Sequence, residues 1–174
     1  ALAGLAGCGG DAASGSTGGA SGTTYKIGVL QLTEHTALDA ANDGFVKALD
    51  DSGISYDIYQ QNAHNDQSAC QTIASTLVNN GCDLILAIAT PAAQAVAGAT
   101  SDIPIVGTAI TDFAASGLVE DNDAPGGNLT GTSDMNPVAD QIALLQQLLP
   151  DAQTVGLLYC TAESNSDIQV SLAE

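Results

Sequence analysis

The chain has 174 residues, of which 45% are hydrophobic, and this is enough to form one compact domain with a buried core. Its net charge at pH 7 is −18, because 20 acidic residues outnumber two lysines, Lys26 and Lys47, and there is no arginine. A surface of this sign repels nucleic-acid phosphates and anionic lipid headgroups, so we expect no nucleic-acid partner and no electrostatic binding to a membrane.

The first eight residues, ALAGLAGC, are apolar and rich in small side chains, which is typical of the end of an export signal. Residues 5–8 (LAGC) resemble a bacterial lipobox, whose cysteine is lipidated before the signal is removed. We therefore predict that residues 1–8 are a signal-peptide remnant with lipidation at Cys8, the alternative being a chance match. Small residues dominate residues 9–24, which predicts a flexible tether with a reach of roughly 20–25 Å.

Three further cysteines, Cys70, Cys82 and Cys160, form no CxxC pair, which argues against a structural zinc site. Cys70 falls early in a predicted helix and Cys82 just beyond its end, so their Cα atoms would be more than roughly 10 Å apart. A disulfide requires less than about 7 Å. We therefore interpret both residues as small packing side chains.

The first strand is expected at Lys26–Leu32, a short apolar run. A helix follows, with Thr36 as its predicted cap, Asp39 in capping-box position and Gly53 at its end. Ser55–Gln60 alternates between apolar and polar residues and predicts a second strand. The apolar face of the first helix comprises Leu38, Ala41, Phe45, Val46 and Leu49.

A second helix, with its apolar face within residues 69–78, is predicted to end at Asn80-Gly81. The continuously apolar run Asp83–Ala89 is typical of a parallel strand buried on both faces. Thr90-Pro91 is expected to start a third helix, with proline at the first helical position. A fourth strand is predicted at Ile103–Thr108.

A short strand, Leu129–Thr132, is predicted to precede a helix that opens at Asn136-Pro137. Another strand is expected at Thr154–Cys160, and Ser166 with Gln169 suggests the capping box of a last helix. The residues of the helix after Pro137 that are expected to face inward are Val138, Ile142, Leu145 and Leu149.

Strands and helices that alternate in this way predict the α/β class: a Rossmann-like parallel sheet with helices on both faces. No Gly, Pro or polar tail ends the last helix before Glu174. We therefore interpret the sequence as part of a longer protein.

Five stretches resemble one family in order and spacing: residues 25–45, 83–97, 103–119, 125–138 and 153–166. The strings ATPAAQA and GTSDMNPV are the most specific. The family is the tryptophan/tyrosine-type ABC transporter substrate-binding proteins, which have two lobes of the type I periplasmic-binding fold. Three positions depart from it: Phe113 stands where many relatives have proline, and Cys160-Thr161 replaces a more usual Asn-Pro.

The resemblance implies that residues 25–133 form lobe one, that the chain crosses near Ser133–Pro137, and that residues 134–174 are the hinge and incomplete start of lobe two. It implies a solute receptor rather than an enzyme, with an amino acid, aromatic types favoured, held between two closing lobes. The implied partners are an ABC permease and ATPase, and a membrane reached through the lipid at Cys8. The implied location is extracytoplasmic, and no cofactor is expected.

Ligands of open parallel sheets bind beyond the carboxyl ends of the strands. Thr90, as a predicted helix cap, with the N–H groups of Ala92 and Ala93, would suit a carboxylate. Asp112 and Glu34 would suit an ammonium group. The alternative is that Thr90 only caps its helix and Asp112 only stabilises its loop. The full set of candidates is Thr33, Glu34, Thr90, Pro91, Ala92, Ala93, Thr111, Asp112, Ser133, Asp134, Glu163, Asn165 and Ser166.

Two histidines, His35 and His64, follow the first two strands, and a metal site with Glu34 or Asp66 as third ligand is conceivable from the sequence. Two histidines without a dense cluster of ligands do not predict one, so we expect no metal.

Enzyme motifs are missing: the turn after the first strand, QLTEHT, contains no GxGxxG, and the chain has neither a phosphate-binding GxxxxGK nor a GxSxG elbow. Two alternatives to a transport receptor stay open. One is a sensory or scavenging lipoprotein of the same fold, and the other is an exported hydrolase that would use Glu34 or His35.

Overall fold

The computed structural model describes residues 23–174, so the predictions for residues 1–8, for Cys8 and for most of the tether lie outside the described residues. The strands are β1 (Thr24–Gln31), β2 (Ser55–Asn62), β3 (Leu84–Ile88), β4 (Ile105–Ile110) and β5 (Leu129–Ser133). The helices are α1 (Thr36–Ser52), α2 (Gln67–Asn79), α3 (Thr90–Ala99), α4 (Val138–Leu148) and α5 (Ser164–Ala173).

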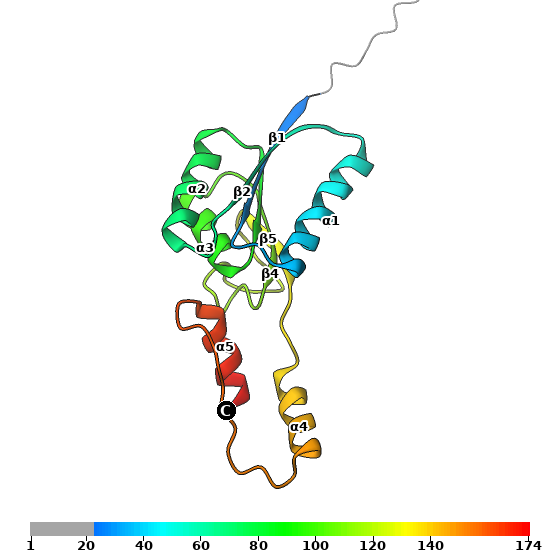
Figure 1. Cartoon of the computed structure of the whole chain (residues 1–174). Coiled ribbons are helices and arrows are strands. Elements are labelled where there is room, and N and C mark those ends of the chain that lie inside the picture. Colours follow the sequence, from blue (N-terminus) through cyan, green and yellow to red (C-terminus); the bar gives the residue numbers. More distant parts are fainter. Residues whose placement is uncertain (1–22) are drawn as a thin grey trace, which may run out of the picture.

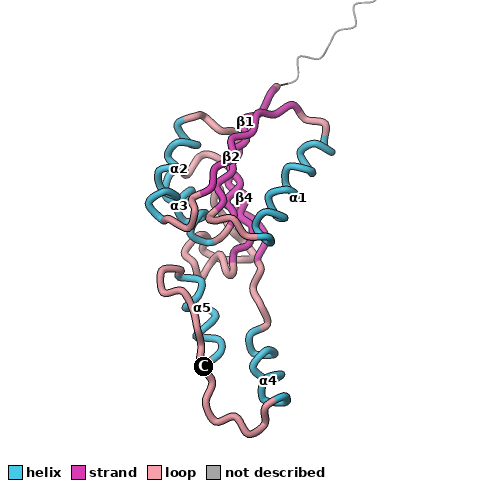
Figure 2. Tube along the Cα trace, viewed as in Figure 1, coloured by secondary structure: helices cyan, strands magenta, loops and turns pink. Residues whose placement is uncertain are grey.

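All five strands are parallel and lie in the order β2-β1-β3-β4-β5, which confirms the predicted fold class. Helix α1 lies on one side of the sheet and α2 and α3 on the other (Figure 1). The strands run from the end where β1 begins toward α4 and α5, so their carboxyl ends face these two helices (Figures 1 and 2). No helix within residues 23–174 is long and apolar enough to span a membrane.

The core is divided unequally between the two faces of the sheet. The larger part lies under α2 and α3, where Leu77 and Val96 pack on Ile85 of β3 with no exposed surface. On the other face, Val29, Leu86 and Ile88 are covered by half-buried residues of α1, which include Leu38 and Phe45. Strand β3 is buried on both sides, which explains its unbroken apolar sequence.

Three predicted helix caps are wrong by one or more residues. The cap of α1 is His35, whose Nδ1 accepts from Ala37 N–H at 3.3 Å, while Thr36 is already helical. Ala89, with no capping side chain, precedes α3, so Thr90 is its first residue. Helix α5 begins at Ser164, which places Ser166 inside it.

The predicted strand at Thr154–Cys160 is not formed: this segment is irregular. A strand exists only through hydrogen bonds to a neighbour, and no described strand lies beside it. The helix before it is only partly covered, since Ile142 and Leu145 are half-buried whereas Leu149, expected to face inward, is 58% exposed. Val138 is the single buried residue within 134–174.

Candidate ligand-binding site at the carboxyl ends of the strands

Strained backbone gathers at one edge of the sheet. Among the described residues, four other than glycine have a positive φ: His64, Asn65, Ala89 and Ala109. They lie after β2, after β3 and near the end of β4, so all four are at the carboxyl edge. Ala89, with φ 85° and ψ 153°, is in a region that side chains rarely adopt. Such strain collects at functional sites, and the sequence contained no signal for it.

The first turn of α3 forms one wall of this edge. Thr90, Pro91, Ala92 and Ala93 are all buried. The Ala93 N–H bonds to the Ala89 carbonyl at 3.1 Å, so it is occupied, contrary to our expectation. Since Pro91 has no N–H, the free first-turn donors of the helix belong to Thr90 and Ala92. The Thr90 hydroxyl is buried and has no hydrogen-bond partner among residues 23–174.

The ends of β4 and β5 form a second wall, with a cavity of about 280 Å³. It brings together three predicted residues, Thr111, Asp112 and Ser133. The Ser133 hydroxyl donates to the Thr111 carbonyl at 2.7 Å and accepts from Met135 N–H at 3.0 Å, so it joins the two strand ends. The other residues that line the cavity, which sequence reasoning missed, are Phe113, Asn122, Gly131 and Met135.

Asp112 is held by its own loop. Its Oδ1 accepts from Ala115 N–H at 2.9 Å and from the Asn122 amide at 3.0 Å. The Ala115 N–H, followed by the Asn122 side chain, lowers the pKa of the Asp112 carboxyl, so the group is ionised at neutral pH. The loop-stabilising role is therefore present, and it fixes a negative charge on a residue of the cavity that the buried Phe113 also lines.

The candidate residues after β1 do not reach the cavity at β4 and β5. Thr33 is half-buried and Glu34 exposed, and neither lines the cavity at β4 and β5. The last residue of β1, Gln31, is buried and donates to Asp39 Oδ1 at 2.7 Å and to the Thr33 carbonyl at 2.8 Å. Asp134 is exposed, and its N–H bonds to the Ile110 carbonyl at 3.0 Å.

The amino end of α5 approaches the same edge. Glu163 precedes this helix, and Asn165 and Ser166 are half-buried in its first turn. Asn165 Oδ1 is buried and has no hydrogen-bond partner in the described chain. Two glutamine side chains reach this end of the helix: Gln67 donates to the Ala162 carbonyl at 2.9 Å and Gln94 to the Ser164 hydroxyl at 3.2 Å. Neither glutamine was among the predicted residues.

The two histidines do not converge on a metal site. His35 caps α1, and His64 is exposed in a turn. Residues 23–174 contain no group of three or more His, Cys, Asp or Glu side chains that could hold a metal ion. Cys70 and Cys82 are free and buried, as their interpretation as packing residues requires.

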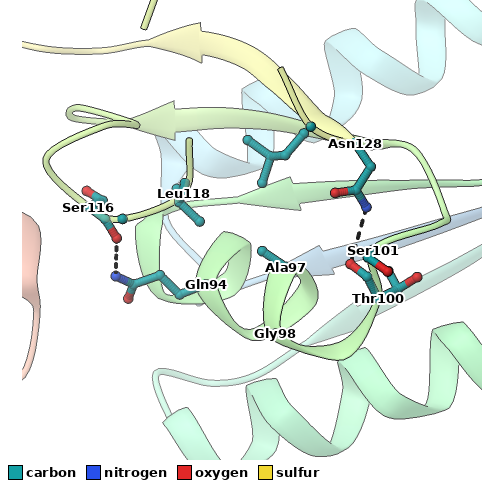
Figure 3. A pocket seen from close by; sticks show the side chains of 11 residues that line it. Gln94, Ala97, Gly98, Thr100, Ser101, Ser116, Leu118 and Asn128 are labelled. Atoms are coloured by element: carbon teal, nitrogen blue, oxygen red, sulfur yellow. Dashed lines mark hydrogen bonds between the residues drawn. The ribbon is translucent and has the colours of Figure 1, made fainter. Parts of the chain in front are cut away.

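A larger cavity, of about 510 Å³, lies between α3 and the connection from β4 to β5 (Figure 3). The Gln94 amide donates to the Ser116 carbonyl at 3.0 Å across it, and Asn128 donates to the Thr100 carbonyl at 3.2 Å. It holds none of the predicted residues and no ionisable side chain. Its size alone does not indicate a ligand, and the strand ends remain the candidate site.

Known proteins resemble this chain in sequence and in fold. A family model described as ABC transporter substrate binding protein matches residues 26–174. A curated relative, the tyrosine-binding protein of Clostridioides difficile (strain R20291), is 48% identical over 149 residues, which are 83% of this chain and 43% of that protein. The chain thus spans about half the length of the relatives it matches.

Three solved structures are similar. An ABC domain from Streptococcus pneumonia in complex with L-Trp is 43% identical, with a TM-score of 0.82 over 87% of this chain and 52% of that one. A conserved domain protein from Vibrio cholerae is 35% identical, with the same TM-score and coverage. A ligand-free, open substrate-binding protein with adhesive properties from Clostridium difficile is 48% identical and has a TM-score of 0.69 over 85% and 52%. The chain therefore superposes better on the tryptophan-bound structure than on the open one.

Proposed function

Since this chain belongs to the ABC transporter substrate-binding protein family, we propose that it is the extracytoplasmic receptor of an importer for an aromatic amino acid. The relatives named for tyrosine and crystallised with L-Trp support this ligand class. The observation that carries the proposal is the cavity at β4 and β5, where the ionised Asp112 lies beside the apolar side chains of Phe113 and Met135.

A zwitterionic ligand needs a donor for its carboxylate and an acceptor for its ammonium group. We propose that the Thr90 hydroxyl and the Ala92 N–H receive the carboxylate, because the amino end of a helix stabilises negative charge. Asp112 would pair with the ammonium group, and Phe113 would contact the ring. Asn165 and Ser166, at the amino end of α5, would cover the ligand from the opposite side.

A thermal-shift and calorimetry series on the full-length protein tests the ligand class, with L-Trp, L-Tyr, L-Phe, L-Leu and divalent metals as probes. A ligand present at about 100 times its Kd stabilises the native state by about 2.7 kcal/mol. We expect the aromatic amino acids to raise the melting temperature and L-Leu to do so less. A shift with none of the amino acids would overturn the proposal.

The Asp112→Asn substitution tests the ammonium contact. It removes the charge and leaves Oδ1 available to the loop, so we expect the Kd for L-Trp to rise by roughly tenfold or more, the value of one charge-assisted hydrogen bond. Asp57→Asn, at an exposed position of β2, is the matched control and should leave the Kd unchanged. An equal Kd for wild type and Asp112→Asn would exclude the contact.

Thr90→Val tests the proposed carboxylate contact through two effects of opposite sign. Removing a buried hydroxyl without a partner should stabilise the ligand-free protein by about 1 kcal/mol. The same change should weaken L-Trp binding, because a hydrogen bond to the ligand is lost. A variant that is stabilised and binds as the wild type does would show that Thr90 does not contact the ligand.

We propose in addition that Cys8 carries a lipid anchor and that residues 9–24 tether the binding domain to the membrane. The acidic surface supports a covalent anchor, because it would not bind an anionic membrane by itself. Expressed with its export signal, the wild type should be found in the membrane fraction and carry the diacylglyceryl mass on Cys8. Cys8→Ser should abolish that mass, and a soluble wild type without it would contradict the proposal.

A further inference from the structure

Two parts of the chain meet at the amino end of α5, and their contact is made by neutral groups. Gln67, the first residue of α2, donates to the Ala162 carbonyl at 2.9 Å. Gln94, in the middle of α3, donates to the Ser164 hydroxyl at 3.2 Å. These bonds join residues that are 95 and 70 positions apart in the sequence. Both glutamines also line one small cavity of about 150 Å³ with Gln71, Pro91 and Ala95.

The Gln94 side chain is held by a hydrogen bond that does not involve α5. Its Nε2 also donates to the Ser116 carbonyl at 3.0 Å, within the same part of the chain as α3 (Figure 3). An amide nitrogen has two hydrogens, so one fixes the side chain and the other points to Ser164. A donor that is already oriented loses little entropy when it forms the second bond.

Charge cannot hold the two parts together. Residues 134–174 contain acidic residues but no Lys, Arg or His, so they repel the acidic sheet region. Both lysines are engaged elsewhere, Lys26 with the Asn80 carbonyl and Lys47 with Asp51. Among the described residues, neutral amide donors are therefore the polar groups that draw the amino end of α5 to α2 and α3.

We propose that Gln67 and Gln94 form a latch that sets the affinity of the receptor by stabilising the arrangement in which α5 lies against α2 and α3. Gln67, Gln94 and Ser164 are not themselves proposed ligand contacts, so the latch acts on the equilibrium between open and closed forms and not through a bond to the ligand. Its link to affinity rests on the proposed function. In agreement with it, the chain superposes better on the tryptophan-bound relative than on the open one.

The test uses the full-length protein with Gln67→Ala, Ser164→Ala and Gln94→Ala, and Gln71→Ala as matched control. Gln71 lines the same cavity and makes no hydrogen bond to residues 162–164 in the part of the chain that the structure describes. We expect each latch variant to weaken L-Trp affinity about two- to tenfold, the factor of one neutral hydrogen bond. The loss should be in the dissociation rate, and 1 M NaCl should not abolish it.

A double-mutant cycle of Gln94→Ala and Ser164→Ala should show that the two losses are not additive, because both remove one bond. Ser164→Ala guards against misfolding, since Ser164 is exposed and its removal leaves the Gln94–Ser116 bond intact. Equal affinity in wild type, Gln67→Ala and Ser164→Ala, or an equal loss in Gln71→Ala, would overturn the latch.

A measurement without ligand separates the latch from the proposed function. Spin labels at Ser75→Cys on α2 and Ser171→Cys on α5, both exposed, report the distance between the two parts in a Cys160→Ser background. The distance distribution should shift to longer values in Gln67→Ala and Ser164→Ala and stay unchanged in Gln71→Ala. This result would support the latch even if no aromatic amino acid bound, whereas identical distributions would exclude it.

Discussion

The sheet region, residues 24–133, and the region after it, residues 134–174, are built from the same kind of sequence but pack differently. Strand β3 and the segment Thr154–Cys160 are both short apolar runs flanked by helices. Four of the five residues of β3 are buried between β1 and β4, whereas Leu158 is fully exposed. A strand pattern therefore becomes a strand only where at least one neighbouring strand completes its backbone hydrogen bonds.

The two regions also differ in what stabilises their elements. Helices α4 and α5 form without a sheet, since helical hydrogen bonds are internal to the segment. Their apolar faces stay partly open, with Leu148 70% and Leu149 58% exposed. Stability should therefore reside in the sheet region. A first pair of variants tests this directly, and two further pairs and one single variant then test the packing within the sheet region, from the largest expected effect to the smallest.

Leu77→Ala and Leu158→Ala compare the two regions directly. Leu77 has no exposed surface in the core under α2, so its truncation should cost about 2–5 kcal/mol of unfolding free energy. Leu158 is fully exposed, and its truncation should change that free energy by less than about 0.5 kcal/mol. Urea unfolding measures both. A cost at Leu158 close to that at Leu77 would show that residues 134–174 have a packed core of their own.

Gly131→Ala and Gly44→Ala compare a close approach in the sheet with an open helix position. A Cβ at Gly131 would collide with the backbone carbonyl of Gly107, its partner in the β4–β5 pairing. We expect a loss of about 1–3 kcal/mol. Gly44 lies in α1 with no atom near a Cβ, so alanine there should gain about 0.5–1 kcal/mol. Chemical denaturation checks the opposite signs, and two losses of the same size would refute the steric argument.

Ala89→Gly tests whether strain at the carboxyl edge is real. Glycine tolerates the φ of 85°, so the variant should gain about 1 kcal/mol after the entropy cost of glycine is subtracted. Ala95→Gly, in the interior of α3, should lose about 1 kcal/mol instead. Differential scanning calorimetry measures the two melting temperatures. A lower melting temperature for Ala89→Gly would mean that the backbone there is not strained.

Asp112→Asn should give the smallest effect, visible as a pH dependence. The pKa of this carboxyl is lowered in the folded state, so its contribution to stability is present above the unfolded pKa of about 4 and is lost as the pH falls through the folded value. The unfolding free energy of the wild type should therefore fall more steeply below about pH 4 than that of the variant. Because Asp112 is only half-buried, the difference should stay below about 1 kcal/mol. Parallel curves of unfolding free energy against pH for the wild type and the variant would contradict this prediction.

Much of the fold and part of the site follow from the sequence. Glycine at residue 53, with φ 71°, ends α1 as predicted, and the apolar run at β3 marks a central strand. Topology then requires that the strand ends share one edge, which brings Thr90 and Asp112 to the same side of the sheet, whereas the cavity that joins Ser133 to Thr111 and Asp112 is seen only in the structure. These features are readable because they depend on residues close in sequence, or on the single rule that the sheet is parallel.

The other features of the candidate site and of its surroundings depend on the tertiary structure alone. The strained Ala89, the cavity between Phe113 and Met135, and the occupied N–H of Ala93 result from how neighbouring strands and loops meet. The bonds from Gln67 and Gln94 to the start of α5 join residues 95 and 70 positions apart, and no local pattern encodes such a pairing. The sequence determined where the helices and turns form, because helical and turn preferences are local, whereas the segment Thr154–Cys160 shows that a strand also needs a neighbour. The packed chain determined which polar groups are left without a partner among the described residues, because that depends on every neighbour at once.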